Sequence, residues 1–391
     1  MLRLVHTADV HLGARHADLG DAAAAQRERQ FAAFTATVDL AIAERVDLVL
    51  VAGDLFDSNV QPRRSVERVA AELSRLAQAR IRTVIVPGTH DVYDRSSVYR
   101  AYDLPALAGT RPAEEMVTVL TPEHPWIHLA AIDAVIHGPC FATKRAPYSP
   151  LRDLAAVEVP EATWKIGVLH AAVAIPGKTD HDDVVVTVEE IAASGLDYLA
   201  LGHWHSAQNA KTKGVTYAYS GAPEAVAVDQ DRAGKVLLVT LDELDGRHRV
   251  EVVEKSVGKT RFDRQEIDAA TVESQPALIA RLQQAADPDL VLDVRLFGVR
   301  PDELDLEPSE VEDSVRSSFL RVRVRDASQP ALTDGALPPP GTIAGAFIRN
   351  VEGRIADLEA SGDDLAVREA TELRDALRLG RLLLAGHEVT L

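Results

Sequence analysis

The first 240 residues alternate short apolar segments with longer amphipathic stretches, and this alternation restricts the fold more than any other feature. The apolar segments are rich in β-branched residues or leucine and mostly end at glycine, which is typical of buried strands. Apolar residues recur at helical spacing between the first strands. The pattern predicts an α/β fold with helices packed against a sheet. The candidate strands are LRLVHTA (2–8), DLVLVAG (47–53), RTVIVPG (82–88), WIHLAAI (126–132), KIGVLHA (165–171), LDYLALG (196–202), VTYAYSG (215–221) and KVLLVTL (235–241).

The pattern of residues along the sequence changes after about residue 257. An Arg- and Asp-rich stretch leads into a helix-like segment, ALIARLQQA, and two strand candidates, LVLDVRLFG and SFLRVRVRD. The proline-rich ALPPPG (336–341) interrupts the chain again, and two segments with helical periodicity follow it. We therefore expect an α/β domain over residues 1–257, a smaller α+β domain over 258–335 and a C-terminal helical segment over 336–391.

Several classes of protein are excluded by the apolar runs and the cysteine content. No apolar run approaches the roughly 18 residues that a membrane-spanning helix needs. The start of the chain places Asp9 inside what would be the apolar region of a secretion signal. A single cysteine, Cys140, cannot close an intramolecular disulfide, which fits a reducing compartment. These observations predict a cytoplasmic protein that does not contact a membrane.

The net charge bears on the kind of partner. With 42 basic and 60 acidic residues the chain carries −18, which argues against a polyanionic partner. The acidity is unevenly distributed, however, because residues 1–100 contain 13 basic and 13 acidic residues. Bound divalent cations would also offset carboxylates locally. The charge therefore weakens a nucleic-acid hypothesis without removing it.

Four short motifs and one histidine lie at the ends of predicted strands. They are Asp9-Val10-His11, Gly53-Asp54-Leu55-Phe56-Asp57, Gly88-Thr89-His90-Asp91, Gly202-His203-Trp204-His205 and His170. Ligands of open α/β sheets collect beyond the carboxyl ends of strands, and residues i and i+2 of an extended segment project to the same side. We therefore expect these carboxylates and imidazoles to converge. Mixed ligands of this kind suit Mn, Fe, Zn or Co, and a pair of cations about 3.5–4 Å apart can hold a phosphate and activate a water.

These motifs resemble the signature of the calcineurin-like metallophosphoesterases, which runs D-x-H, G-D-x-x-D, G-N-H-D or E, H, and G-H-x-H. Within that family, HTADVHLG, VAGDLFDS, PGTHD and LALGHWH are similar to the DNA-repair exonuclease branch of SbcD- and YhaO-like nuclease subunits. The resemblance implies a two-sheet sandwich flanked by helices, with the smaller α+β domain as a capping, DNA-binding domain.

The same resemblance implies a dinuclear centre of two divalent cations, with manganese expected first and iron, zinc or cobalt as alternatives. The residues that it implies as ligands are Asp9, His11 and His205 for one cation, Asp54 as a bridge, and His170 and His203 for the other. His90 would donate a proton to the leaving oxygen, and Asp57 would orient the ring of His90.

One position departs from the family pattern. Thr89 stands where the family has a ligating asparagine, and a hydroxyl is a poorer donor to a cation than an amide oxygen. We therefore expect one tight metal site and a second site that fills only with excess manganese or with substrate. A contact between Thr89 and substrate is the alternative.

The sequence allows two interpretations of each of three further features. Trp204 either packs in the hydrophobic core or stacks on a nucleobase. The helical arginines Arg63, Arg64, Arg68 and Arg75 form a solvated face or grip phosphates. The C-terminal helices close the small domain or dock a partner, which the resemblance implies to be an SMC-like ATPase.

The expected function is metal-dependent hydrolysis of phosphodiester bonds in DNA, by an exonuclease or endonuclease of DNA repair. The first alternative keeps the site and changes the substrate to cyclic nucleotides or other small phosphate esters, which the net charge favours. The second is a non-catalytic scaffold for the ATPase partner, with Thr89 marking a degenerate site. The sequence leaves open whether two copies of the chain pair.

Overall fold

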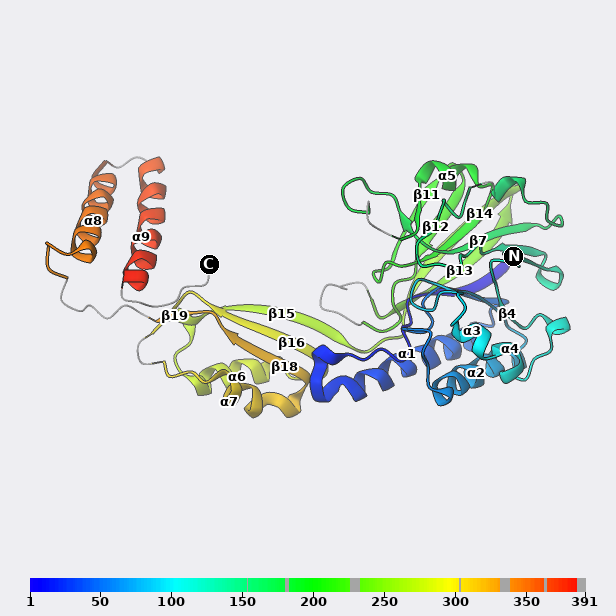
Figure 1. The fold of residues 1–391 in the computed structure, drawn as a ribbon, viewed down its shortest axis with the longest axis horizontal. Helices are drawn as coiled ribbons and strands as arrows, with labels where there is room; N and C mark the ends of the chain where they lie inside the picture. Colours follow the sequence, from blue (N-terminus) through cyan, green and yellow to red (C-terminus); the bar gives the residue numbers. More distant parts are fainter. Residues whose placement is uncertain are drawn as a thin grey trace. The chain divides into compact units, whose positions relative to one another are not determined.

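The computed structural model describes residues 1–152, 154–179, 183–225, 233–301, 304–330, 338–361 and 364–384. Its contacts divide the chain into two compact units, Met1–Asp263 with Asp289–Val291, and Arg264–Pro288 with Leu292–Leu391. Each unit has its own sheets and helices (Figure 1). The division into three domains stays a prediction, and part of its last segment, residues 336–337, 362–363 and 385–391, lies outside the described residues.

The first unit contains two six-stranded sheets. The first has the order β14-β13-β1-β2-β3-β4, with β1 to β4 parallel, and the second has the order β11-β12-β10-β7-β6-β5, with β6, β7, β10 and β12 parallel. The strands of the first sheet are β1 (Leu2–Thr7), β2 (Leu48–Ala52), β3 (Arg82–Val86), β4 (Val117–Val119), β13 (Lys235–Leu244) and β14 (Arg247–Ser256). Those of the second sheet are β5 (Trp126–Leu129), β6 (Ala134–His137), β7 (Trp164–His170), β10 (Tyr198–Gly202), β11 (Gln208–Thr212) and β12 (Val215–Tyr219).

The two sheets share one apolar core and are covered on their outer faces. Leu4 and Leu50 of the first sheet pack in one cluster with Ile166 and Ala200 of the second. The helical stripes predicted from the sequence lie buried against the other face of the first sheet. The helices of this unit are α1 (Ala23–Ala43), α2 (Arg63–Gln78), α3 (Val98–Ala101), α4 (Leu104–Leu107) and α5 (Val188–Ala193), with short 3-10 turns at Ala17–Ala22, Pro112–Glu114, Ala130–Ile132 and Leu154–Ala156 and a small strand pair, β8 (Ala172–Val173) and β9 (Val185–Val186). The architecture is a two-sheet sandwich flanked by helices.

All eight predicted strands are confirmed, as β1, β2, β3, β5, β7, β10, β12 and β13. The sequence did not reveal β4, β6, β11 and β14. β11 and β14 are edge strands with polar, largely exposed side chains, so they lack the apolar signal of a buried strand. β4 has only three residues.

The second unit pairs a three-stranded sheet with helices. Its sheet has the order β15-β16-β18, with β15 (Arg261–Asp268), β16 (Asp287–Phe297) and β18 (Phe319–Asp326). Its other elements are α6 (Gln275–Gln284), α7 (Pro308–Val315), α8 (Ile343–Ser361), α9 (Asp364–Leu384), the short pair β17 (Val299–Arg300) and β19 (Gln329–Pro330), and 3-10 turns at Ala269–Thr271 and Arg316–Ser318. Among the described residues, no helix has both the length and the apolar character needed to cross a bilayer.

A buried polar pair joins the two sheets of the first unit. His6 of β1 is fully buried, and its Nδ1 lies 2.8 Å from the hydroxyl oxygen of Tyr198 on β10. Burial lowers the pKa of His6 to about 3, so the ring is neutral in the folded protein at pH 5. In the unfolded chain the same ring has an ordinary pKa near 6.5 and takes up a proton below that pH.

We expect the free energy of unfolding to fall as the pH drops from about 6.5 toward 3, by up to about 1.4 kcal/mol per pH unit from His6 alone. The double variant His6→Leu/Tyr198→Phe removes both polar partners and should lose this contribution. Urea unfolding of both proteins at pH 7, 6 and 5 measures the difference. Equal pH slopes in the two proteins would contradict a neutral buried His6.

Candidate metal centre

Five predicted metal ligands converge beyond the carboxyl ends of β1, β2, β7 and β10. His11 Nε2 and His205 Nε2 are 3.2 Å apart, and His205 Nε2 lies 3.9 Å from Asp9 Oδ1. His170 Nδ1 lies 3.9 Å from the same Asp9 oxygen. In the described part of the chain, three groups have candidate ligand atoms within 4.8 Å of one another: Asp9–His11–His205, Asp9–Asp54–His170 and His11–Asp57–His90.

Asp54 lies between the two predicted sets of ligands. Its Oδ1 accepts a hydrogen bond of 2.8 Å from the backbone N–H of His90. Its Oδ2 lies 3.2 Å from His170 Nε2 and 3.8 Å from His11 Nε2, which belong to different predicted sets. This placement suits a carboxylate that bridges two cations.

His203 is placed differently from the other candidates. Its backbone N–H donates to both carboxylate oxygens of Asp9, at 3.0 Å each. Its ring lies edge-to-face with that of His170, with centroids 5.5 Å apart, and belongs to none of the three groups found among the described residues. The role of His203 as a ligand therefore stays a prediction, while its backbone holds Asp9 in place.

The convergence does not arise from extended backbone, so that part of the sequence argument is wrong. Asp9, His11, Asp54 and His203 have φ angles of 52°, 49°, 50° and 104°, in the left-handed region that residues other than glycine rarely adopt. β1 and β10 end at Thr7 and Gly202, before these residues begin. The side chains converge because the chain turns sharply beyond each strand.

Two motif glycines permit close approach between the loops. A Cβ on Gly202 would lie 1.9 Å from the carbonyl oxygen of Ala52, and a Cβ on Gly88 would lie 2.2 Å from Asp54 Oδ1. Neither position tolerates a side chain without moving its neighbour. Gly88 and Gly202 therefore matter for the close packing of the strand ends around Asp54.

The ring of His170 is held in the orientation that a metal ligand requires. Its Nδ1 bonds at 3.1 Å to the carbonyl oxygen of Ala52, which fixes the ring. Its Nε2 is buried, lies 3.2 Å from Asp54 Oδ2, and meets no hydrogen bond of acceptable geometry among the residues that the structure describes. A histidine that donates one ring N–H to a carbonyl and presents the other nitrogen to a buried site is arranged as metal ligands are.

The electrostatics of the cluster reflect opposite charges held out of water. Burial lowers the pKa of His170, but the negative charges of Asp54 and Asp9 outweigh it and raise the pKa to about 10. Burial opposes ionisation of Asp54, yet the surrounding imidazoles hold the pKa of Asp54 below its usual range. A cation bound at the site would displace the ring protons, because imidazole ligates a metal only in its neutral form. Ionised carboxylates and neutral imidazoles suit borderline divalent cations such as manganese, iron or zinc, so the residues present fit a dinuclear site.

Asp57 and His90 lie at the rim of the site. Asp57 Oδ1 is 3.2 Å from His11 Nδ1 and 3.8 Å from His90 Nδ1, and the Asp57 carbonyl oxygen lies 2.9 Å from His90 Nδ1. The backbone of Asp57 thus orients His90, whereas its carboxylate mainly orients His11. The family resemblance implied only that Asp57 orients the ring of His90, and it did not indicate the contact with His11.

Asp91 is a positioning residue rather than a member of the metal groups. Its fully buried carboxylate accepts hydrogen bonds from the backbone N–H groups of Gly88 and Phe56, at 2.7 and 3.1 Å, and from the Tyr99 hydroxyl at 2.6 Å. It therefore ties the loop after β3 to the loop after β2. The sequence motif Gly88–Asp91 pointed to Asp91. No sequence signal pointed to Tyr99 as its partner.

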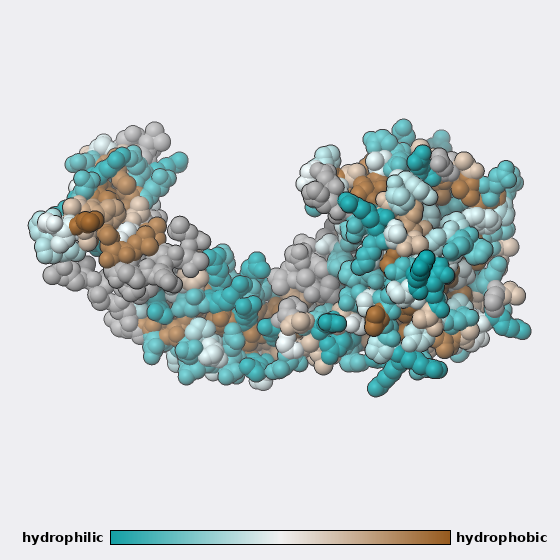
Figure 2. All heavy atoms as spheres, in the orientation of Figure 1, coloured by the Kyte–Doolittle hydropathy of each residue, from teal (hydrophilic) through white to brown (hydrophobic). Residues whose placement is uncertain are grey.

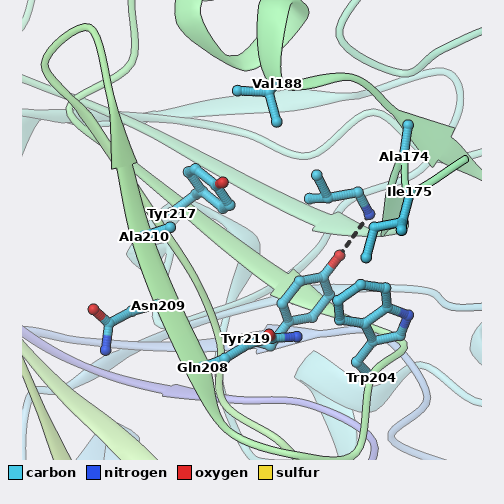
Figure 3. A pocket seen from close by; sticks show the side chains of 10 residues that line it. Ala174, Ile175, Val188, Trp204, Gln208, Asn209, Ala210, Tyr217 and Tyr219 are labelled. Carbon is cyan, nitrogen blue, oxygen red and sulfur yellow. Dashed lines mark hydrogen bonds between the residues drawn. The ribbon is translucent and has the colours of Figure 1, made fainter.

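Trp204 points away from the metal candidates that flank it. Its ring stacks on that of Tyr219, with centroids 4.9 Å apart and planes 17° from parallel, against the outer cluster of the second sheet. Figure 3 shows the two rings side by side at a pocket of about 240 Å³, with the Tyr219 hydroxyl accepting from the backbone N–H of Val173. The packing reading of Trp204 is supported.

Comparison with known proteins identifies a family and several relatives. The model of the family described as calcineurin-like phosphoesterase matches residues 2–207. The DNA double-strand break repair protein Mre11 of Aeropyrum pernix is 28% identical over 252 residues, which cover 62% of this chain and 58% of that protein. The metallophosphoesterase YhaO of Bacillus subtilis is 25% identical, over 57% of this chain and 53% of YhaO. The chain thus spans somewhat more than half the length of these relatives, whereas Mre11 of Methanopyrus kandleri is 24% identical over 96% of this chain and 83% of that protein.

Thr89 generates a prediction about metal affinity. Its side chain is partly exposed in a narrow pocket that His170 also lines. We expect calorimetric titration with Mn²⁺ to resolve one tight and one weak site, and the variant Thr89→Asn, which supplies an amide oxygen, to tighten the weak site about tenfold or more. Two equally tight sites in the unmodified chain would contradict this expectation.

Proposed function

Because the chain belongs to the calcineurin-like phosphoesterase family, we propose that it hydrolyses phosphodiester bonds in DNA, as an exonuclease or endonuclease of DNA repair. The observation that carries the proposal is the convergence of four buried residues, Asp9, His11, Asp54 and His170, with the partly buried His205. The similarity to proteins named for DNA double-strand break repair supports DNA as the substrate.

We propose that two divalent cations, manganese in the first place, occupy this site. Asp9, His11 and His205 would hold one cation, His170 and His203 the other, and Asp54 would contact both. Bound there, the cations would supply Lewis-acid activation of a water and neutralise charge on the phosphoryl oxygens. The side chains contribute an orienting frame, since Ala52, Asp57 and the backbone of His203 fix the rings and the carboxylate of Asp9.

His90 is the proposed proton donor to the leaving oxygen. Its side chain is 47% exposed at the rim of the site, and its ring lies edge-to-face with that of His11 at 4.7 Å between centroids. Because its Nδ1 bonds to the carbonyl of Asp57, the donating atom would be Nε2. Protonation of a departing alkoxide near neutral pH is a step that suits histidine.

The sheet of the second unit carries several arginines on one face. α6 and α7 lie on one side of the β15-β16-β18 sheet (Figure 1), and alternate residues of the strands form the other face. By this alternation five arginines and five carboxylates share that face: Arg264, Arg295, Arg321, Arg323, Arg325, Glu266, Asp268, Asp287, Asp289 and Asp293. Arg264 and Arg325 pair with Asp293, and Arg295 pairs with Glu266. The face is therefore balanced in charge, and its exposed Arg323 is the candidate for contact with a phosphate group.

Three of the four α2 arginines considered in the sequence analysis support a solvated face instead. Arg63 pairs with Glu67, Arg68 with Glu28, and Arg75 with Glu72 and Asp39. Carboxylates already engage these guanidinium groups, so their contribution to phosphate binding would be small.

The C-terminal helices support a protein partner, and we propose an SMC-like ATPase. Figure 2 shows hydrophobic side chains gathered on the α8–α9 pair. Ile343, Leu383 and Leu384 are exposed there. Apolar side chains of this kind on a helical pair suit docking of a partner helix.

A small phosphate ester is the second candidate substrate, because the net charge of −18 disfavours long polyanions. Linear duplex DNA and bis(4-nitrophenyl) phosphate, each with Mn²⁺, separate the two candidates. If DNA contacts about three phosphate-binding arginines, its affinity for the chain falls about 40-fold between 50 and 200 mM salt. The variant Arg323→Ala should then reduce the slope of log affinity against log salt concentration by about 0.9. Turnover of the small ester with no degradation of DNA would contradict the proposal.

His90→Ala should lower turnover of DNA by about two to four orders of magnitude, because the leaving oxygen loses its proton donor. The matched variant Asp54→Asn should instead lose Mn²⁺ binding. Calorimetry with Mn²⁺ and single-turnover rates on the same preparations measure both effects. Loss of metal binding in His90→Ala would overturn its assignment as the proton donor.

A further inference from the structure

One loop of the first unit is strongly basic within an acidic part of the chain. Residues 138–152, GPCFATKRAPYSPLR, contain Lys144, Arg145 and Arg152 and no acidic residue, whereas residues 101–200 contain 6 basic and 14 acidic residues. We call this segment the basic loop. Two aromatic residues, Phe141 and Tyr148, alternate with its cations. Interleaved cations and aromatic rings are typical of surfaces that bind single-stranded nucleic acid.

The basic loop reaches the candidate metal centre. Thr89 and His170 line a narrow pocket of about 20 Å³ together with Phe141, Thr143 and Lys144 of the loop. Lys144 therefore lies at the same pocket as two residues of the site. The connection between this loop and the site depends on the fold, since Thr89 and Lys144 are far apart in the sequence.

A wider pocket continues from the narrow one. It has a volume of about 270 Å³, shares Pro139, Cys140, Phe141 and Pro150 with the narrow pocket, and is also lined by Trp126, His137, Tyr148 and Arg152. This volume is near the lower end of the range for small-molecule pockets, roughly 300–1,000 Å³, and suits one flat ring system such as a nucleobase. A base pair within a stacked duplex could not enter it.

The aromatic side chains of the loop are arranged for contact with such a ring. Phe141 and Tyr148 lie edge-to-face at 5.3 Å, and Tyr148 is 53% exposed, so one face of the pair is available. The guanidinium carbon of Arg152 lies 5.9 Å from the centroid of Tyr148. The loop is anchored by a hydrogen bond of 2.8 Å from the backbone N–H of Ala146 to the carbonyl oxygen of Asp183.

The charge of the wider pocket comes from its lysine and arginine neighbours. Burial lowers the pKa of His137 to about 4, so this ring is neutral near pH 7 and adds no positive charge. Lys144 and Arg152 are therefore the positively charged residues among those that line the two pockets.

We propose that the basic loop binds the single strand adjoining the scissile phosphate, with one unpaired base against Phe141 and Tyr148 and its phosphates along Lys144 and Arg152. This inference rests on the proposed nuclease function and adds a strand preference to it. Stacking and phosphate contacts tolerate every base, so the loop would favour unpaired over paired DNA without reading its sequence.

Binding of a 5′-fluorescein-labelled dT12 strand to the full chain in EDTA, read by fluorescence anisotropy, tests the proposal without hydrolysis. Tyr148→Ala should weaken binding about 5- to 100-fold, as loss of one base–aromatic stack does, and Tyr148→Phe should stay within about twofold because it keeps the ring. Lys144→Ala should reduce the slope of log affinity against log salt concentration by about 0.7. Tyr217→Ala and Lys211→Ala, which lie outside the basic loop, are matched controls and should bind normally.

A duplex of the same length separates base contact from general phosphate contact. Tyr148→Ala should change duplex affinity less than about twofold. Equal losses on both forms, or no loss on the single strand, would overturn the proposal. If the chain fails to cleave DNA with Mn²⁺ but Tyr148→Ala still weakens dT12 binding, the nuclease function fails and the loop assignment stands. If the chain cleaves DNA and the variants bind dT12 like the unmodified chain, the nuclease function stands and the assignment of the basic loop fails.

Discussion

The structure of the first unit depends on two carboxylates that are held out of water next to imidazoles. Asp9 and Asp54 are almost completely buried, and a buried charge is costly unless other groups compensate it. Backbone N–H groups of His203 and His90 compensate part of each carboxylate. Carboxylate oxygens and ring nitrogens also lie close together, which is favourable when cations lie between them. This requirement explains why the strand ends of both sheets must meet at one point.

The backbone around these carboxylates is strained, and the fold holds it in that state. Left-handed conformations at residues other than glycine cost about 1–3 kcal/mol each and persist only when the surroundings fix them. The N–H of Asp9 donates to the carbonyl of Gly53, and the N–H of His11 donates to that of Asp54, so the two loops hold each other. Asp91 adds a third loop to this network through Gly88 and Phe56. The stability of the sandwich therefore supports the conformation of the site.

The sequence predicted the buried strands and the convergence of most candidate ligands, because both follow from local patterns. Apolar segments identify strands, and the carboxyl ends of parallel strands lie at one edge of a sheet. It could not predict the φ angles beyond the strand ends, so it gave an incorrect reason for the convergence of Asp9 and His11. It also could not predict that Lys144 and Thr89 line one pocket, or that the carboxylate of Asp57 contacts His11, because these contacts depend on tertiary packing.

The distribution of charge explains how an acidic chain can present surfaces to a polyanion. At physiological ionic strength a charge is screened beyond about 8 Å, so distant carboxylates have little effect on a phosphate bound at the surface. The local balance then decides, and it differs between regions: carboxylates pair with the arginines of α2, whereas residues 138–152 contain no acid. The net charge of −18 would slow the approach of DNA at low salt, where screening is weak, more than it would weaken contacts already made. Binding of a polyanion by an acidic chain therefore depends on where its lysines and arginines lie rather than on how many it has.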